Sequence, residues 1–164
     1  MTDLIIERLF DAPRDVVYQA FVDPDQLARW FGPIAFACPR DTIEVDARPG
    51  GRYRMTMVNR ADPSQQSPIK AVFDEVRENE LLVGHEDLMG ELAETFGTDR
   101  MSLRVEFHDR GEQTLVRLVQ GPYDEKFEPM ARAGWNGSFT KLDNIFLARL
   151  GMIPAEYVET QLAT

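Results

Sequence analysis

The stretch GWNGSFTKLDNIF, residues 134–146, decides the fold because it lies in a long amphipathic helix that needs a partner surface. We predict this helix from about Asp124 to Leu150, since its apolar or small residues recur every three or four positions. Those positions are Phe127, Ala131, Gly134, Trp135, Ser138, Leu142 and Ile145. A helix with one apolar stripe is stable only when another element covers it. We therefore expect a second layer that largely buries Trp135, Leu142 and Ile145.

Two glycines interrupt this helix. Each costs about 1 kcal/mol of helix stability relative to alanine. Gly134 lies on the apolar stripe, so we expect its missing side chain to permit a close contact between the helix and the second layer. Gly137 lies near the edge of the stripe and is expected to tolerate alanine.

The second layer is predicted by alternation of apolar and polar residues, which is typical of half-buried strands. Ile43, Val45 and Ala47 alternate with charged residues, and Tyr53, Met55 and Met57 do the same after the Pro49-Gly50-Gly51 turn. Similar segments follow at 69–73, 81–86, 101–107 and 114–120, and an apolar run at 4–10 opens the chain. With no strand–helix–strand spacing, the chain reads as α+β, with about seven strands in one antiparallel sheet.

Two short helices are predicted between the first strand and the others. Asp11 or Ala12 is expected to cap the first helix, with Pro13 at its first position. Asp23 and Pro24 repeat this pattern for the second helix, which ends at Gly32-Pro33. Residues 87–98 fit no strand and are expected to form a short helix or a loop over one end of the sheet.

Composition narrows the class of protein. The 164 residues are expected to form one domain, 1–164, and the single cysteine, Cys38, excludes an internal disulfide. The formal net charge of −10, without a basic cluster, argues against nucleic-acid binding. No apolar run is long enough for a membrane span and no leader precedes the first strand, so we expect a cytoplasmic protein.

Catalytic and metal-binding patterns are scarce. His85 and His108 are the only histidines, and although Glu86 and Asp87 follow His85, no second histidine or cysteine completes a metal site. The sequence has no nucleophile elbow, phosphate-binding loop or dinucleotide fingerprint. It therefore assigns no catalytic residue, no metal and no cofactor, and it favours a protein that is not an enzyme.

Three segments carry a family resemblance. FDAPRDVVYQAFVDPDQLARWFGP (residues 10–33), DARPGGRYRM (46–55) and GWNGSFTKLDNIF resemble signature blocks of the START-like (SRPBCC) superfamily, in the branch of activators of the heat-shock protein ninety ATPase. The resemblance implies a helix-grip fold, in which a curved antiparallel sheet wraps around the C-terminal helix, often with a hydrophobic cavity between them. The residues that would line such a cavity are Trp30, Phe31, Tyr53, Met55, Met57, Phe73, Leu103, Gly134 and Trp135. The same residues would also suit a solid core.

Three functions are compatible with this resemblance. The first is non-catalytic binding of a small hydrophobic molecule in the cavity, and the second is regulation of a chaperone ATPase. The third is an enzyme of the polyketide-cyclase or hydrolase kind, with Tyr53, His85 and Arg54 as candidate polar residues.

A homodimer is also expected. Leu115 and Val119 flank Arg117 on the predicted outer face of the sheet. Either the insertion at 87–98 or a second subunit should cover them.

Overall fold

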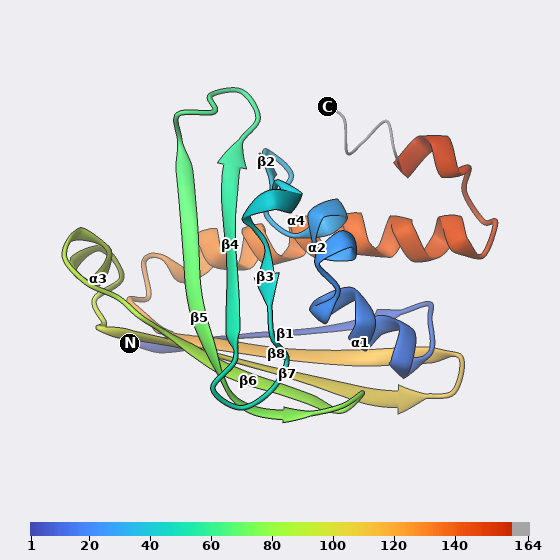
Figure 1. The fold of residues 1–164 in the computed structure, drawn as a ribbon, viewed down its shortest axis with the longest axis horizontal. Helices are drawn as coiled ribbons and strands as arrows, with labels where there is room; N and C mark the ends of the chain where they lie inside the picture. The colour runs from blue at the N-terminus through green and yellow to red at the C-terminus, as the bar shows by residue number, and fades with distance from the viewer. Residues whose placement is uncertain (159–164) are drawn as a thin grey trace.

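The computed structural model describes residues 1–158 as a curved antiparallel sheet with a long helix lying along it (Figure 1). The strands are β1 (Thr2–Phe10), β2 (Phe36–Ala37), β3 (Glu44–Val45), β4 (Arg52–Asn59), β5 (Gln66–Arg77), β6 (Leu81–Asp87), β7 (Arg100–Arg110) and β8 (Gln113–Tyr123). The helices are α1 (Arg14–Val22), α2 (Pro24–Trp30), the 3-10 turn η1 (Arg40–Thr42), α3 (Glu91–Phe96) and α4 (Glu128–Arg149). The α+β helix-grip architecture is confirmed.

The strands are joined in the order β1-β8-β7-β6-β5-β4-β2, with β3 also paired to β4. Every pairing is antiparallel. The sheet in the described part of the chain has eight strands where about seven were predicted. The additional strand, β2, has two residues, which is too short for an alternating pattern to show.

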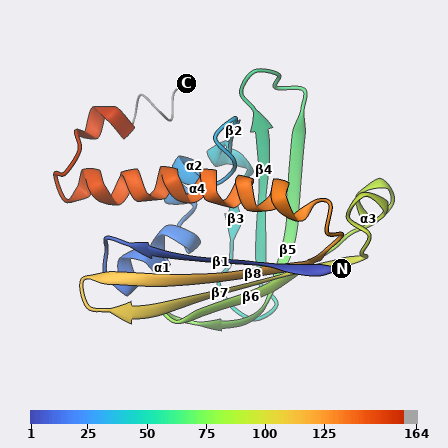
Figure 2. The ribbon, with the colours of Figure 1, turned by 180° about the vertical axis from the view of Figure 1, so that it is seen from behind.

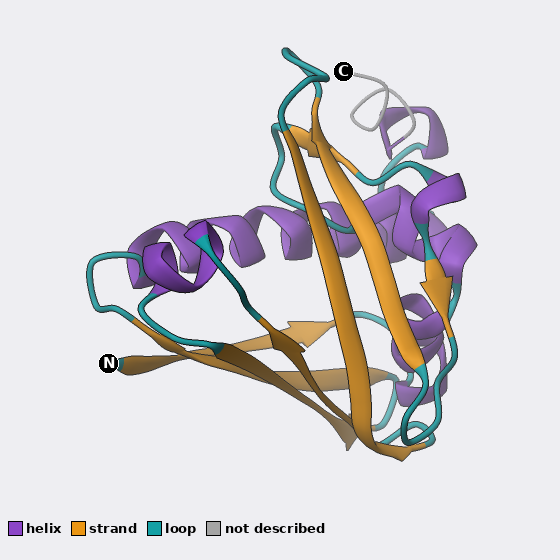
Figure 3. Ribbon diagram, turned by 60° about the vertical axis from the view of Figure 1, so that its left-hand side comes forward, coloured by secondary structure: helices purple, strands orange, loops and turns teal. Residues whose placement is uncertain are grey.

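The sheet bends sharply between β5 and β6, so that β4 and β5 rise away from the other long strands (Figure 3). A register shift between Phe73 and Glu75 lies at this bend. Gly84 is required there, because a Cβ atom on it would lie 2.7 Å from the carbonyl oxygen of Val72. The curvature therefore depends on a position where no side chain can be accommodated.

Local sequence signals predicted the first residue of α1 and of α2 to within one position of the observed start. Asp23 caps α2, its carboxylate accepting a hydrogen bond from the Asp25 backbone N–H at 2.9 Å, and Pro24 is the first helical residue, as predicted. The prediction for α1 was wrong by one position: Pro13 is the N-cap, with extended backbone, and Arg14 begins the helix. The turn between β5 and β6 contains Asn79 at a φ of 63°, a conformation that asparagine tolerates.

The buried face of α4 is rotated from the predicted one. Leu142 is fully buried as expected, but Trp135 and Ile145 are only partly buried. Phe139 and Phe146, which the prediction left out of the stripe, are 0% and 2% exposed. The correction arises because both sets of residues satisfy a three-to-four spacing, so the spacing alone cannot choose between neighbouring faces.

The glycines of α4 accommodate a loop and not the sheet, which corrects the prediction for Gly134. A Cβ atom on Gly134 would lie 3.4 Å from Pro33 Cγ, an ordinary contact. A Cβ atom on Gly137 would lie 3.2 Å from Ile34 Cγ1 and 3.3 Å from the Ile34 backbone nitrogen, which is tighter. The segment after α2 therefore crosses α4 over both glycines, and the closer approach is at Gly137, which was expected to be the tolerant position.

The insertion at 87–98 was predicted to be either a short helix or a loop, and it contains a short helix, α3. Phe96 of α3 packs edge-on against Tyr123 and Phe127, with ring centroids 6.0 and 5.9 Å apart. These contacts hold α3 beside the N-terminal end of α4 (Figure 1). The insertion therefore does not cover Leu115 and Val119, and that version of the prediction is wrong.

Helix α4 also protects the free edge of the sheet, which is strand β1 (Figure 2). Arg8 of β1 forms an ion pair with Asp143 of α4 at 2.7 Å. Arg132 of α4 donates a hydrogen bond to the backbone carbonyl of Ile5 at 3.0 Å. These contacts occupy the edge that an extended segment of another chain would otherwise pair with.

Candidate functional site

One half of the concave face is a closed aromatic core. Helices α1 and α2 cover this half together with the C-terminal part of α4 (Figure 1). Phe139 lies in contact with the rings of Phe10, Phe21 and Trp30, at centroid separations of 5.3, 6.1 and 6.2 Å. All four side chains are between 0 and 3% exposed. In this half the aromatic rings pack against one another and are shielded from solvent.

The other half of the concave face is only partly covered. Here β5 and β6 separate from each other, and the N-terminal part of α4 lies across the side where they separate (Figure 3). The inward-facing apolar side chains of this half pack against the core but stay partly exposed. We call them the apolar lining, and they are Met57, Ile69, Ala71, Leu103, Ala131 and Trp135.

The nine residues predicted to line a cavity are divided between these two halves. Trp30, Phe31, Tyr53, Met55 and Phe73 belong to the buried core. Met57, Leu103 and Trp135 belong to the apolar lining, and Gly134 contacts the loop at Pro33. Phe31 and Trp135 connect the two groups, with ring centroids 5.8 Å apart.

The polar atoms of Trp30 and Tyr53 are satisfied by the protein itself. Trp30 Nε1 donates to the Ala20 carbonyl and the Tyr53 hydroxyl donates to the Phe21 carbonyl, both at 2.9 Å. Burial raises the pKa of Tyr53 well above its usual value, so this hydroxyl keeps its proton. The first bond joins α2 to α1 and the second joins α1 to β4, so neither group is available for a ligand.

Sequence reasoning missed two polar residues that face the apolar lining. Gln120 of β8 pairs with Leu4 and Leu103 and shares their inward face. Glu86 of β6 pairs with Met101, and burial raises the pKa of its carboxyl. The only signal available was a polar residue at an inward position of an alternating strand, and such positions are common near strand ends.

The candidate catalytic residues do not converge. Tyr53 and Arg54 are adjacent on β4 and so lie on opposite faces of the sheet. His85 faces outward, where its Nδ1 atom lies 2.8 Å from a carboxylate oxygen of Asp74. Within residues 1–158 no group of three or more His, Cys, Asp or Glu side chains is arranged to hold a metal ion. Tyr53, Arg54 and His85 therefore do not meet in one site, and the His85–Asp74 pair lies on the outer face of the sheet.

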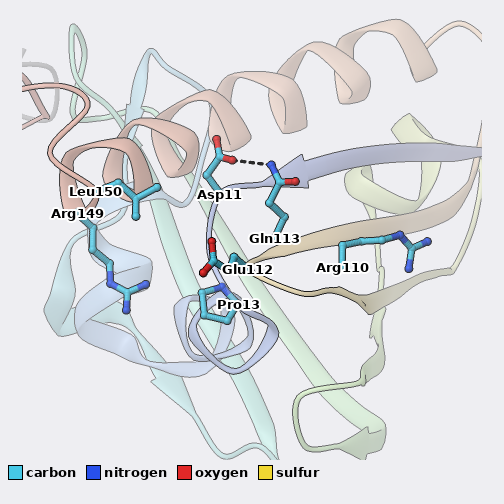
Figure 4. Close-up of a pocket in the computed structure, with 7 residues that line it drawn as sticks. All are labelled: Asp11, Pro13, Arg110, Glu112, Gln113, Arg149 and Leu150. Carbon is cyan, nitrogen blue, oxygen red and sulfur yellow. Dashed lines mark hydrogen bonds between the residues drawn. The ribbon is translucent and has the colours of Figure 1, made fainter.

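Two surface hollows lie away from the apolar lining. A hollow of about 740 Å³ at the β7–β8 turn is lined by Asp11, Pro13, Arg110, Glu112, Gln113, Arg149 and Leu150. Figure 4 shows Arg110 pointing away from the two carboxylates, while Gln113 donates a hydrogen bond to Asp11 at 2.7 Å. The second, of about 420 Å³, is lined by residues of α1, of the β3–β4 connection, of the end of β5 and of the turn that follows it. None of the nine predicted residues lines either hollow.

Comparison with protein families gives one match. The model of the family described as "Activator of Hsp90 ATPase homolog 1-like protein" matches residues 11–146. The chain belongs to this family. No curated protein resembles the sequence closely enough to count as a relative.

Solved structures of similar proteins share the fold of this activator-like family. A Chromobacterium violaceum protein is 24% identical with a TM-score of 0.76, over 88% of this chain and 96% of its own. An AHSA1 protein from Silicibacter pomeroyi is 18% identical with a TM-score of 0.72, over 92% and 99%. An AHSA1-like protein from Aeromonas hydrophila is 19% identical with a TM-score of 0.70, over 93% and 96%. The START-like resemblance is confirmed for the fold.

Proposed function

We propose that the protein binds a small hydrophobic molecule between the N-terminal half of α4 and the sheet. The observation that carries this proposal is the apolar lining: six inward-facing side chains from β4, β5, β7 and α4 that the fold leaves partly exposed. Burying apolar surface contributes roughly 25 cal/mol per Å², so a ligand that covers these side chains is favoured over water. The closed aromatic half supplies a rigid wall for the same site.

The composition of the lining suits a ligand that enters by displacing side chains. Met57 and Leu103 are flexible enough to change rotamer, and methionine adapts its shape at low cost. Trp135 is held in place by a hydrogen bond from its Nε1 atom to Gln120 Oε1 at 2.6 Å. The lining therefore combines movable side chains with one fixed aromatic surface, as ligand sites commonly do.

A filling substitution tests this proposal. Ala131→Phe introduces a ring into the lining, whereas Ala133→Phe introduces the same ring on the exposed face of α4. We expect wild-type protein and Ala133→Phe to bind the neutral dye Nile red with increased fluorescence, and Ala131→Phe to bind it about tenfold more weakly at an unchanged melting temperature. Native mass spectrometry of wild-type protein from its own host should show a copurified apolar molecule. Absence of both dye binding and a copurified molecule would refute the proposal.

Regulation of a chaperone ATPase is the second candidate, because the matching family is named for such activators. The same variants separate the two functions. Stimulation of the host chaperone ATPase that is equal for wild type and Ala131→Phe, without dye binding, would favour chaperone regulation through the outer surface.

Residues 1–158 contain no helix long and apolar enough to cross a membrane. The cytoplasmic location stays a prediction.

The homodimer also stays a prediction, and the outer face of the sheet is its proposed interface. Ile5 and Leu9 of β1 are 45% and 47% exposed and lie beside Val119 and Leu115 of β8. Arg117 between them is within 3.5 Å of Glu7. Light scattering should give twice the chain mass of 18.7 kDa for wild type and a single chain mass for Leu9→Glu. A monomer mass for wild type at high concentration would exclude this dimer.

A further inference from the structure

Gln120 is the residue that gives the apolar lining a polar contact. Its register partners on the neighbouring strands, Leu4 and Leu103, both face the interior. Gln120 therefore points between the sheet and α4, and it is itself only partly buried. A long amide among apolar side chains is favourable only when its polar atoms have partners.

Two hydrogen bonds determine the orientation of this amide. Gln120 Oε1 accepts one from Trp135 Nε1 and one from the Tyr123 hydroxyl, each at 2.6 Å. An indole N–H can only donate, so the reversed amide would place two donors against each other. The two bonds occupy both lone pairs of Oε1. The oxygen is therefore committed to the protein, and the NH2 group is the end of the amide without a partner among residues 1–158.

Gln120 Nε2 has no acceptor within residues 1–158. Its two N–H groups are thus available to a bound molecule, and the short bonds at Oε1 hold them in a fixed direction. A donor held in place in a partly apolar site selects for an acceptor, because a ligand lacking one leaves that donor unpaired when it displaces water.

The charge around the lining selects against anions. Glu86 faces the same interior, separated from Gln120 by strand β7. Its Oε1 atom accepts a hydrogen bond from the Lys70 backbone N–H at 3.2 Å, and the nearby Lys70 charge offsets part of its negative charge. The whole chain carries a formal charge of −10. A ligand carboxylate or phosphate would be repelled at this position.

We infer that the bound molecule is a neutral, largely apolar compound with one hydrogen-bond acceptor, such as a ketone, aldehyde, ester or ether oxygen, that Gln120 Nε2 contacts. This inference rests on the proposed function and narrows its ligand class. Free fatty acids and pure hydrocarbons are excluded as preferred ligands, the first by charge and the second by the unpaired amide.

A matched pair of ligands tests the acceptor. 2-Acetylnaphthalene and 2-ethylnaphthalene have nearly the same shape, and only the first has a carbonyl. In a purely apolar site the hydrocarbon binds more tightly, because it is less soluble in water. Displacement of Nile red by each compound measures the two affinities. We expect wild-type protein to bind the ketone at least as tightly as the hydrocarbon.

The variant Gln120→Glu is the decisive comparison. One carboxylate oxygen can still accept from Trp135 and Tyr123, while the other replaces the free donor by an acceptor. We expect the ratio of ketone to hydrocarbon affinity to fall about tenfold in Gln120→Glu, and to stay at its wild-type value in the exposed control Gln66→Glu.

The outcomes separate the two levels of the proposal. If both compounds displace the dye with a ratio that Gln120→Glu leaves unchanged, the ligand site stands and the role of Gln120 is refuted. If wild-type protein binds neither the dye nor the ketone, the proposed function itself fails. A variant that is partly unfolded binds both compounds more weakly by the same factor, so the ratio of the two affinities does not change. The ratio therefore distinguishes loss of the Gln120 contact from loss of folded protein.

Discussion

Replacing Phe139 by alanine will lower the free energy of unfolding by about 3–5 kcal/mol, the cost of removing a fully buried aromatic side chain. The ring is 0% exposed and has four aromatic neighbours, Phe10, Phe21, Trp30 and Trp135. These neighbours belong to β1, α1, α2 and α4, so the surrounding residues cannot all move to fill the space. The loss therefore combines the transfer free energy of the ring with the cost of a cavity.

Urea denaturation of wild type and Phe139→Ala measures this effect. The control is Met130→Ala on the same helix, where the side chain is 62% exposed and the free energy should change by less than about 0.5 kcal/mol. A loss below about 1 kcal/mol for Phe139→Ala would show that the ring does not hold the helix to the sheet and to α1 and α2.

Replacing Lys141 by methionine will stabilise the protein, by up to about 3 kcal/mol below pH 8. The side chain is 7% exposed, and the bond from its ammonium group to the Pro33 carbonyl is long, at 3.4 Å. Burial lowers the pKa of Lys141 from 10.5 to about 8, and the nearby Arg60 charge adds to this effect. An ammonium that loses its hydration and gains one weak acceptor is a cost to the folded state.

The sign of the pH dependence follows from the lowered pKa. Between pH 8 and 10.5 the unfolded chain binds the proton that the folded chain has released, so this residue makes wild-type stability rise with pH across that window. Below pH 8 both states are protonated and the full cost is present. The advantage of Lys141→Met should therefore be greatest near neutral pH and should shrink as the pH approaches 10.5.

Denaturation curves for wild type and Lys141→Met at several values between pH 6.5 and 10 measure this difference, with Lys70→Met at an exposed position as control. The control should change stability little at any pH. A Lys141→Met variant that is less stable than wild type at pH 7 would show that the ammonium is held by favourable partners, and a pH-independent difference would contradict the lowered pKa.

Much of the fold could be predicted because its signals are local. Asp23 and Pro24 start α2 through contacts within a few residues, and the alternation from Tyr53 to Met57 reports one strand face. The face of α4 could not be chosen in the same way. Ser138 and Phe139 are adjacent and both fit a helical stripe, so only packing against Phe10, Phe21 and Trp30 selects the ring.

The candidate site was predicted only in part, for the same physical reason. Met57, Leu103 and Trp135 were identified as interior residues because each belongs to a series of apolar residues at the regular spacing of a strand or a helix. Gln120 was not identified, because its role depends on Trp135, which reaches it from another element and determines which end of the amide is free. Lys141 was not identified either, because its burial depends on the loop at Pro33, which a distant part of the chain supplies.

By itself, the sequence determined an α+β chain with one antiparallel sheet, two short helices after the first strand and a long C-terminal helix, since each of these follows from periodicity and capping over a few residues. The tertiary structure decided which half of the concave face is closed and which is left partly exposed. That division depends on where α1 and α2 lie on the curved sheet and on the divergence of β5 from β6 (Figure 3). Both are set by packing between residues far apart in the chain, for which no local pattern exists.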